Sequence, residues 1–117
     1  MTRLDLDRGE AALARDLATA GPRFRLVRVP SDEALGLEVD GAPSMWSGSL
    51  DDPGLLEGFV SQLQDVVMEA TTEQWPMCPD HRHALSPRAR DGWVAWCCAE
   101  SEEPIAPLGE LGGVIRQ

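Results

Sequence analysis

The sequence predicts an α+β domain, with an N-terminal helix, one or more antiparallel hairpins, one long amphipathic helix and a C-terminal hairpin. Two segments repeat apolar residues at helical spacing, and extended segments occur in pairs separated by short turn-forming stretches. A chain of 117 residues is long enough to bury one core but not two. We therefore expect a single domain over 1–117, with an α+β core in 1–74, a separate hairpin in 75–99 and a tail in 100–117.

The first predicted helix runs from about Arg8 to Ala20. Asp7 and Glu10 have the side chains and the spacing of a capping box, in which both accept hydrogen bonds from N–H groups at the helix start. Gly21-Pro22 predicts the helix end, because proline cannot continue a helix and glycine readily adopts the left-handed conformation found there. The apolar residues between these signals recur at helical spacing: Leu13, Ala14, Leu17 and Ala18.

Two extended segments follow at 24–29 and 34–40, joined by the four residues 30–33. In the second segment apolar residues alternate with small or polar ones, which is typical of a strand with one buried face. The short connection predicts an antiparallel hairpin. We expect 41–43 to end this hairpin and Met45-Trp46 to begin a third short strand.

The clearest helix extends from Asp52 to about Trp75. Asp51 or Asp52 can cap it, and Pro53 suits its first position. At about 100° per residue its apolar side chains share one broad face, which we expect to close the core. These side chains are Leu56, Phe59, Val60, Leu63, Val66, Val67 and Ala70.

The opposite face of this helix is acidic and has no basic residue. It is formed by Glu57, Asp65, Glu69 and Glu73. Charged side chains are rarely buried without partners, so a solvated face explains these acids most simply. The alternative is a docking surface for a partner protein, with the four acids as the partner-binding residues.

The charge balance argues against nucleic acid as a partner. Twenty acidic and ten basic residues give a net charge of −10, and every basic residue is Arg. The lack of Lys, Asn and Tyr is typical of a GC-rich bacterial genome. Nucleic-acid affinity comes largely from cations that displace counterions, so we expect no binding to DNA, RNA or an anionic membrane. Arg23, Arg25 and Arg28 are explained by a solvated strand edge.

The sequence also predicts a reducing compartment. No apolar run is long enough to cross a bilayer, and the N-terminus is acidic and amphipathic rather than a signal peptide. We therefore expect a cytoplasmic protein. Three cysteines, two of them adjacent, make a poor disulfide framework, and in such a compartment cysteine near histidine indicates metal binding first.

All cysteines and histidines of the chain lie within 78–98. The stretch 78–81 (Cys-Pro-Asp-His) has a spacing typical of structural zinc sites, and His83 lies on the same loop. A hairpin over 85–98 then returns to this loop through Asp91-Gly92, a strong turn signal. The pattern predicts a zinc-ribbon-like hairpin that binds a metal ion. The alternative is that the cysteines pack in the core and the histidines lie on a polar loop.

Strand alternation separates the two terminal cysteines. Neighbouring residues of a regular strand point to opposite faces, so Cys97 and Cys98 are not expected to bind one ion together unless the strand has ended. Periodicity alone leaves open which of the two faces Cys78.

The segment from Leu55 to Ala99 resembles a group of small actinobacterial proteins. In that group a long helix ends in Trp-Pro-x-Cys-Pro-x-His-x-His and a hairpin finishes in Trp-x-Cys. These motifs correspond to 75–83 and 96–98 here. The resemblance implies that Cys98 is a ligand and Cys97 a spare thiol, and it implies no activity. Ala99 departs from the pattern, which has Pro at that position.

The predicted ligands of one structural Zn²⁺ are therefore Cys78, His81, His83 and Cys98, with Cys97 as the alternative to Cys98. No Gly-rich phosphate loop, carboxylate pair or Ser-based triad accompanies them. The sequence thus favours an accessory or adaptor protein that binds another protein and has no catalytic residues.

Two other functions are alternatives. A metal-dependent enzyme needs an open coordination position and a base, and Asp80 is the only obvious base in the loop. An acidic inhibitor that imitates nucleic acid needs carboxylates spaced like phosphates on one surface.

The remaining expectations concern packing. We expect the four tryptophans to fill the core, since the chain has only two Phe and no Tyr. In the tail we expect 104–108 to add an edge strand, the glutamates at 100, 102 and 103 to be solvated, and the glycines at 109, 112 and 113 to loosen the end.

Overall fold

The computed structural model describes residues 6–29, 34–48, 50 and 52–114. It has an α+β fold, as predicted. Along the chain the elements are α1 (Leu6–Leu17), a 3₁₀ turn (Ala18–Ala20), β1 (Phe24–Val29), β2 (Ala34–Val39), β3 (Ala42–Trp46), α2 (Pro53–Thr71), β4 (Ser86–Arg90), β5 (Trp93–Cys97), β6 (Pro104–Pro107) and a second 3₁₀ turn (Leu111–Gly113).

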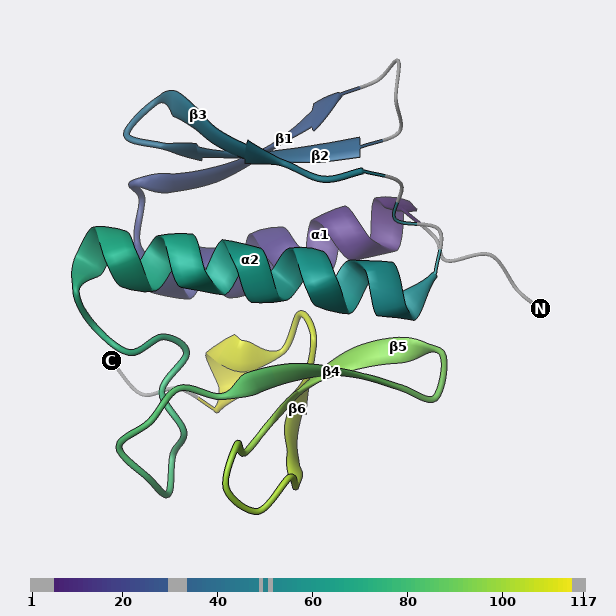
Figure 1. The fold of residues 1–117 in the computed structure, drawn as a ribbon, viewed down its shortest axis with the longest axis vertical. Helices are drawn as coiled ribbons and strands as arrows, with labels where there is room; N and C mark the ends of the chain where they lie inside the picture. Colours follow the sequence, from purple (N-terminus) through teal and green to yellow (C-terminus); the bar gives the residue numbers. More distant parts are fainter. Residues whose placement is uncertain (1–5, 30–33, 49, 51, 115–117) are drawn as a thin grey trace.

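The elements form three layers (Figure 1). One antiparallel sheet, in the order β1-β2-β3, lies on one side of the two helices, and a second antiparallel sheet, in the order β4-β5-β6, lies on the other. A helix between two sheets must bury more than one narrow stripe. The broad apolar face predicted for α2 meets this demand.

The predicted core face of α2 is confirmed. Asp52 caps the helix by accepting a hydrogen bond from the Leu55 N–H, and Pro53 occupies its first turn. The helix ends at Thr71, earlier than predicted, because Thr72 adopts the left-handed conformation (φ 56°). Asp51, the other predicted cap, lies outside the described residues. The buried apolar side chains of the face are Leu56, Phe59, Val60, Leu63 and Val67.

The start of α1 differs from the prediction. The helix begins at Leu6, so Asp7 lies inside its first turn and pairs with Arg28 of β1 instead of closing a capping box. The predicted stop at Gly21 is confirmed: the α-helix ends at Leu17, a 3₁₀ turn continues it to Ala20, and Gly21 follows with φ 115°.

Two Asp-Gly turns shape the hairpins. Asp91-Gly92 joins β4 to β5 as predicted, with φ values of 50° and 78°. Asp40-Gly41 has the same conformation and joins β2 to β3. The third strand therefore begins at Ala42 and ends at Trp46, contrary to the prediction that it begins at Met45. The β1–β2 linker at 30–33 lies outside the described residues.

The tail is better ordered than predicted. Residues 104–107 form the edge strand β6, as expected, but Gly109 is buried and a Cβ there would meet the backbone of Ala12 at 3.1 Å. Gly109 donates its N–H to the buried carboxylate of Asp16, as do the Leu111 N–H and the Trp96 indole. The tail therefore closes the core over α1 instead of loosening.

Burial raises the pKa of the Asp16 carboxyl above its ordinary value, and the three hydrogen bonds oppose that shift. All three partners are N–H donors at 2.6–3.0 Å. A carboxylate accepts from all three donors through its two oxygens, whereas a neutral acid or an amide has a donor in place of one of these acceptors. This group ties α1 to the second sheet and to the tail.

Three of the four tryptophans follow the prediction. Trp75 and Trp96 are buried and meet edge to face with ring centroids 5.7 Å apart, and Trp93 is half-buried. Trp46 is 52% exposed, which contradicts the expectation. Its ring lies over Gly36 on the neighbouring strand, where a Cβ would come within 2.2 Å of it.

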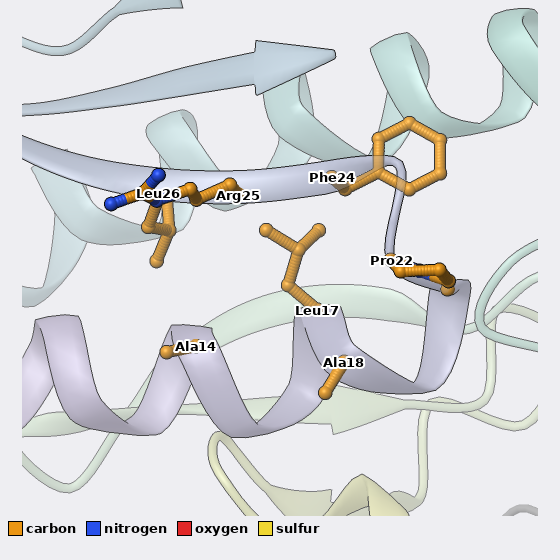
Figure 2. Close-up of a pocket in the computed structure, with 8 residues that line it drawn as sticks. Ala14, Leu17, Ala18, Pro22, Phe24, Arg25 and Leu26 are labelled. Atoms are coloured by element: carbon orange, nitrogen blue, oxygen red, sulfur yellow. The ribbon is translucent and has the colours of Figure 1, made fainter. Parts of the chain in front are cut away.

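The arginines of β1 lie at a solvated sheet edge, as predicted. Arg23 pairs with Asp40, and Arg25 is exposed. Beside this edge is an open cavity of about 430 Å³ between α1 and β1. Leu17 points across it from the helix toward the strand, as Figure 2 shows.

We predict that Phe59→Ala lowers the free energy of unfolding by about 3–5 kcal/mol, the usual range for a buried Phe. Phe59 is 4% exposed and lies in the central core cluster. Urea denaturation measures this change, and a loss below about 1 kcal/mol contradicts the packing of α2 described above.

We predict that Asp16→Asn costs about 1.5–3 kcal/mol, because the amide leaves at least one buried N–H facing another donor. Asp65→Asn on α2 is the matched control, since Asp65 is exposed. If both variants unfold at the parent's urea concentration at neutral pH, the three hydrogen bonds do not hold the tail.

Candidate metal centre

The loop between α2 and β4 is a small closed structure. Met77 and Ala84 form a β-bridge, and Cys78 donates its N–H to the His83 carbonyl at 2.9 Å. The Leu85 N–H also bonds to the Pro76 carbonyl at 2.7 Å. These bonds hold the two sides of the loop together, so residues between them face one another.

One side chain of α2 fastens this loop to the helix. Gln64 is buried, and its amide nitrogen donates to the Trp75 carbonyl at 3.1 Å and to the Leu85 carbonyl. These carbonyls flank the loop on its two sides. Gln64 is not among the residues predicted from the sequence, although a polar residue between Leu63 and Val67 on an apolar face is a signal of such a role.

Cys98 reaches the loop from the second sheet. It follows the last residue of β5, and a turn then exchanges two hydrogen bonds with it: the Cys98 N–H donates to Glu103, and the Glu102 N–H donates to Cys98, each at 2.8 Å. The Ser101 N–H lies 3.5 Å from the Cys98 Sγ. Hydrogen bonding from Ser101 lowers the pKa of the Cys98 thiol to about 6.

The four predicted ligands come together. One donor atom from each of Cys78, His81, His83 and Cys98 lies within 4.8 Å of the others. The His81 Nδ1 is 3.4 Å from each cysteine sulfur. Zinc bonds of about 2.3 Å to sulfur and about 2.0 Å to nitrogen place neighbouring tetrahedral ligands roughly 3.5 Å apart, so these separations fit that geometry.

Neighbouring acceptors determine the tautomer of both imidazoles. The Nδ1 of His83 lies 3.1 Å from the Ala84 carbonyl, which accepts only from an N–H, so the lone pair of this ring is on Nε2. That Nε2 is the one buried side-chain nitrogen or oxygen without a hydrogen-bond partner among the described residues. A buried atom of this kind is costly unless it binds something.

Glu100 orients the other imidazole. Its Oε2 lies 3.3 Å from the His81 Nε2, so Nε2 carries the proton and Nδ1 presents its lone pair to the two sulfurs. The same oxygen is 3.8 Å from the His83 Nε2, beyond hydrogen-bonding distance. The side chain of Glu100 is exposed, as predicted for the tail, but it is a neighbour of the site that the sequence analysis missed.

The other candidate residues lie elsewhere. Cys97 is buried, but its sulfur faces the Ala95 carbonyl and is not part of the cluster. The structure therefore brings Cys98, and not the alternative Cys97, to the other three. Asp80 is exposed and also lies outside the group.

The four predicted acids do not form one exposed helix face, and Glu73 lies beyond the helix, which ends at Thr71. Asp65, Glu69 and Glu73 are exposed, as expected. Glu57 is half-buried, and its Oε1 accepts a hydrogen bond from the Ala89 N–H of β4 at 2.6 Å. The prediction that Glu57 is solvated with the others is wrong, because this carboxylate caps a backbone donor at the sheet edge.

No protein-family model, curated protein or solved structure matches this chain significantly. Within the part of the chain that the structure describes, no helix has both the length and the apolar character needed to span a membrane. The site is therefore interpreted from its own geometry.

We predict that Cys98→Ser reduces zinc affinity at least about 100-fold, whereas Cys97→Ser changes it less than about threefold. The two substituted cysteines are neighbours in the chain, but only the Cys98 sulfur belongs to the cluster. Competition with a chromogenic chelator measures both affinities. The reverse order of effects contradicts the assignment of Cys98.

Proposed function

We propose that this protein binds one Zn²⁺ through Cys78, His81, His83 and Cys98. The observation that carries the proposal is the buried, unpartnered Nε2 of His83, which belongs to a group of four donor atoms within 4.8 Å. Two sulfurs and two imidazole nitrogens are the donor set that zinc takes in structural sites. The single acid at the site, Glu100, contacts the imidazole nitrogen that faces away from the sulfurs.

A four-donor site favours a structural role over a catalytic one. Catalytic zinc keeps a coordination position open for water or substrate, whereas the four protein donors here would complete a tetrahedron around one ion. Bound zinc contributes folding free energy by joining segments that would otherwise be held by weaker contacts. In this chain it would join the 75–85 loop to the end of β5, and so the helical layer to the second sheet.

We further propose that the protein is a non-enzymatic adaptor that binds another protein. Three exposed acids, Asp65 and Glu69 on α2 and Glu73 just beyond its end, support this proposal, since α2 contains no basic residue. Charge of one sign on an exposed face speeds encounter with a partner of opposite charge and disfavours others.

Native mass spectrometry tests the metal. We expect one zinc ion per chain under native conditions and none after denaturation in acid. Removal of zinc with EDTA should lower Tm by roughly 10 °C or more, because the folding free energy of the site is lost. A zinc-free native mass from zinc-supplemented expression, together with an unchanged Tm in EDTA, contradicts the proposal.

Removal of the three acidic charges tests the acidic surface. The triple variant Asp65→Asn, Glu69→Gln, Glu73→Gln leaves Glu57 and its bond to β4 in place. We expect the parent's Tm within about 3 °C and the parent's zinc content, because these side chains are exposed. Its binding partners, compared with the parent's by quantitative pull-down, should be lost. Retention of all of them moves the adaptor surface elsewhere.

A further inference from the structure

The four outer sheet edges differ in their protection. Natural edge strands are protected from further pairing by charges, proline or a covering group. The β1 edge carries arginines, β4 carries arginines and the capping Glu57, and β6 has proline at both ends. The segment 41–48, which contains β3, has one proline and no charged residue. The β3 edge is thus the least protected of the four.

An apolar groove lies beside this edge. It has a volume of about 340 Å³ and is bounded by the end of β3 and the first turns of α2. Leu55 on its wall is 46% exposed, and glycines at 54 and 58 leave the helix surface open. Trp46 also lines the groove and is 52% exposed, and its ring lies over Gly36 on the face away from the buried Leu35 and Leu37. Apolar surface is therefore exposed on both sides of β3.

An acidic part of the α2 surface follows the groove. The exposed stripe of α2 passes from Leu55 and Gly58 through Gln62 to Asp65 and Glu69, at steps of three or four residues. Figure 1 shows α2 running beneath β3 in the opposite direction, so the acidic part lies below the beginning of the strand. One side of the molecule therefore presents an uncharged strand edge, an apolar groove and then an acidic stripe.

We propose that this side binds an extended segment of a partner protein in which apolar residues alternate with Lys or Arg. The proposal rests on the adaptor function above and names the partner's chemistry. The segment adds a strand to β3 through backbone hydrogen bonds. Alternate side chains of an added strand point to opposite faces, so apolar ones enter the groove at Leu55 and basic ones reach Trp46, whose ring face attracts cations. Where the segment passes beyond the groove, a groove-facing residue that is basic instead of apolar meets Asp65.

Charge also selects against other occupants. A second copy would bring another net charge of −10 and the same acidic stripe to the edge, so two copies repel one another. The cavity on the α1 side is similar in size but has Arg25 at its rim (Figure 2), which disfavours a basic segment. The β3 side is the one that fits this partner.

Fluorescence anisotropy with two synthetic peptides tests the proposal. The first is an octapeptide of alternating Lys and Val carrying fluorescein, and the second has Glu in place of Lys. With zinc-loaded full-length protein at about 0.15 M salt, we expect saturable binding of the Lys peptide at least tenfold tighter than that of the Glu peptide. Two further Lys peptides are N-methylated at the valines or at the lysines; alternate N–H groups of a strand face the same neighbour, so one of the two should bind at least fivefold more weakly.

A pair of variants distinguishes binding in the groove from general electrostatic attraction between the basic peptide and the acidic protein. Leu55→Arg places a cation in the groove, and Ala11→Arg adds the same charge to an exposed position on α1. We expect at least a tenfold loss for Leu55→Arg and less than a threefold change for Ala11→Arg. Equal effects overturn the assignment, as does a parent that binds neither peptide. A parent that sediments as a dimer, together with a Leu55→Arg variant that sediments as a monomer, also overturns it, because a second copy then occupies the edge.

The triple neutralised variant distinguishes this proposal from the adaptor function. If it loses its pulled-down partners while Leu55→Arg keeps all of them, the acidic surface docks a protein and the groove does not take part. That result overturns the present inference and leaves the adaptor proposal standing. Loss of partners by Leu55→Arg alone, with Ala11→Arg unaffected, supports the groove.

Discussion

The position of the candidate metal centre depends on the carboxamide of Gln64. Its two N–H groups bond to the carbonyls of Trp75 and Leu85, so one rigid helix holds both sides of the loop that carries Cys78, His81 and His83. The side chain is 6% exposed. Without it two carbonyls would be buried without a partner, and each such group costs about 1–3 kcal/mol. An apolar substitute of similar size would fill the space but release the loop.

A second buried polar group acts at the other helix. The carboxylate of Asp16 receives N–H groups from Trp96, Gly109 and Leu111, and so joins α1 to the central strand of the second sheet and to the chain that follows β6. Burial of apolar surface between the layers is strongly favourable but has no direction, so it does not fix how one layer sits on the next. Directed hydrogen bonds fix one relative position of the layers. Gln64 and Asp16 thus determine how the helices sit on the sheet that supplies Cys98.

Much of this arrangement follows from local sequence patterns. The apolar face of α2, its cap at Asp52 and the Asp-Gly hairpin are properties of short segments, and the structure contains all of them. The candidate ligands were also recognisable, because Cys78, His81 and His83 share one loop. The choice of Cys98 over Cys97 came from a resemblance, since strand alternation says only that they point apart.

The features that were missed depend on distant residues. Asp16 looks like any polar position of an amphipathic helix, and its partners lie 80 to 95 residues away. The bond between Glu57 and Ala89 spans 32 residues, so a solvated acid was the natural expectation. Residue type alone favours a core position for Trp46, but its partner is Gly36, which leaves the ring on the outer face of a sheet.

X-ray absorption at the zinc edge tests the central claim most directly, because it measures the atoms bound to the metal in the folded protein. The proposed centre predicts two sulfur neighbours at about 2.3 Å and two nitrogen neighbours at about 2.0 Å, with imidazole scattering beyond them. The same measurement on Cys98→Ser should lose one sulfur. A parent spectrum with only oxygen and nitrogen neighbours, or with one sulfur, contradicts the Cys78, His81, His83 and Cys98 centre.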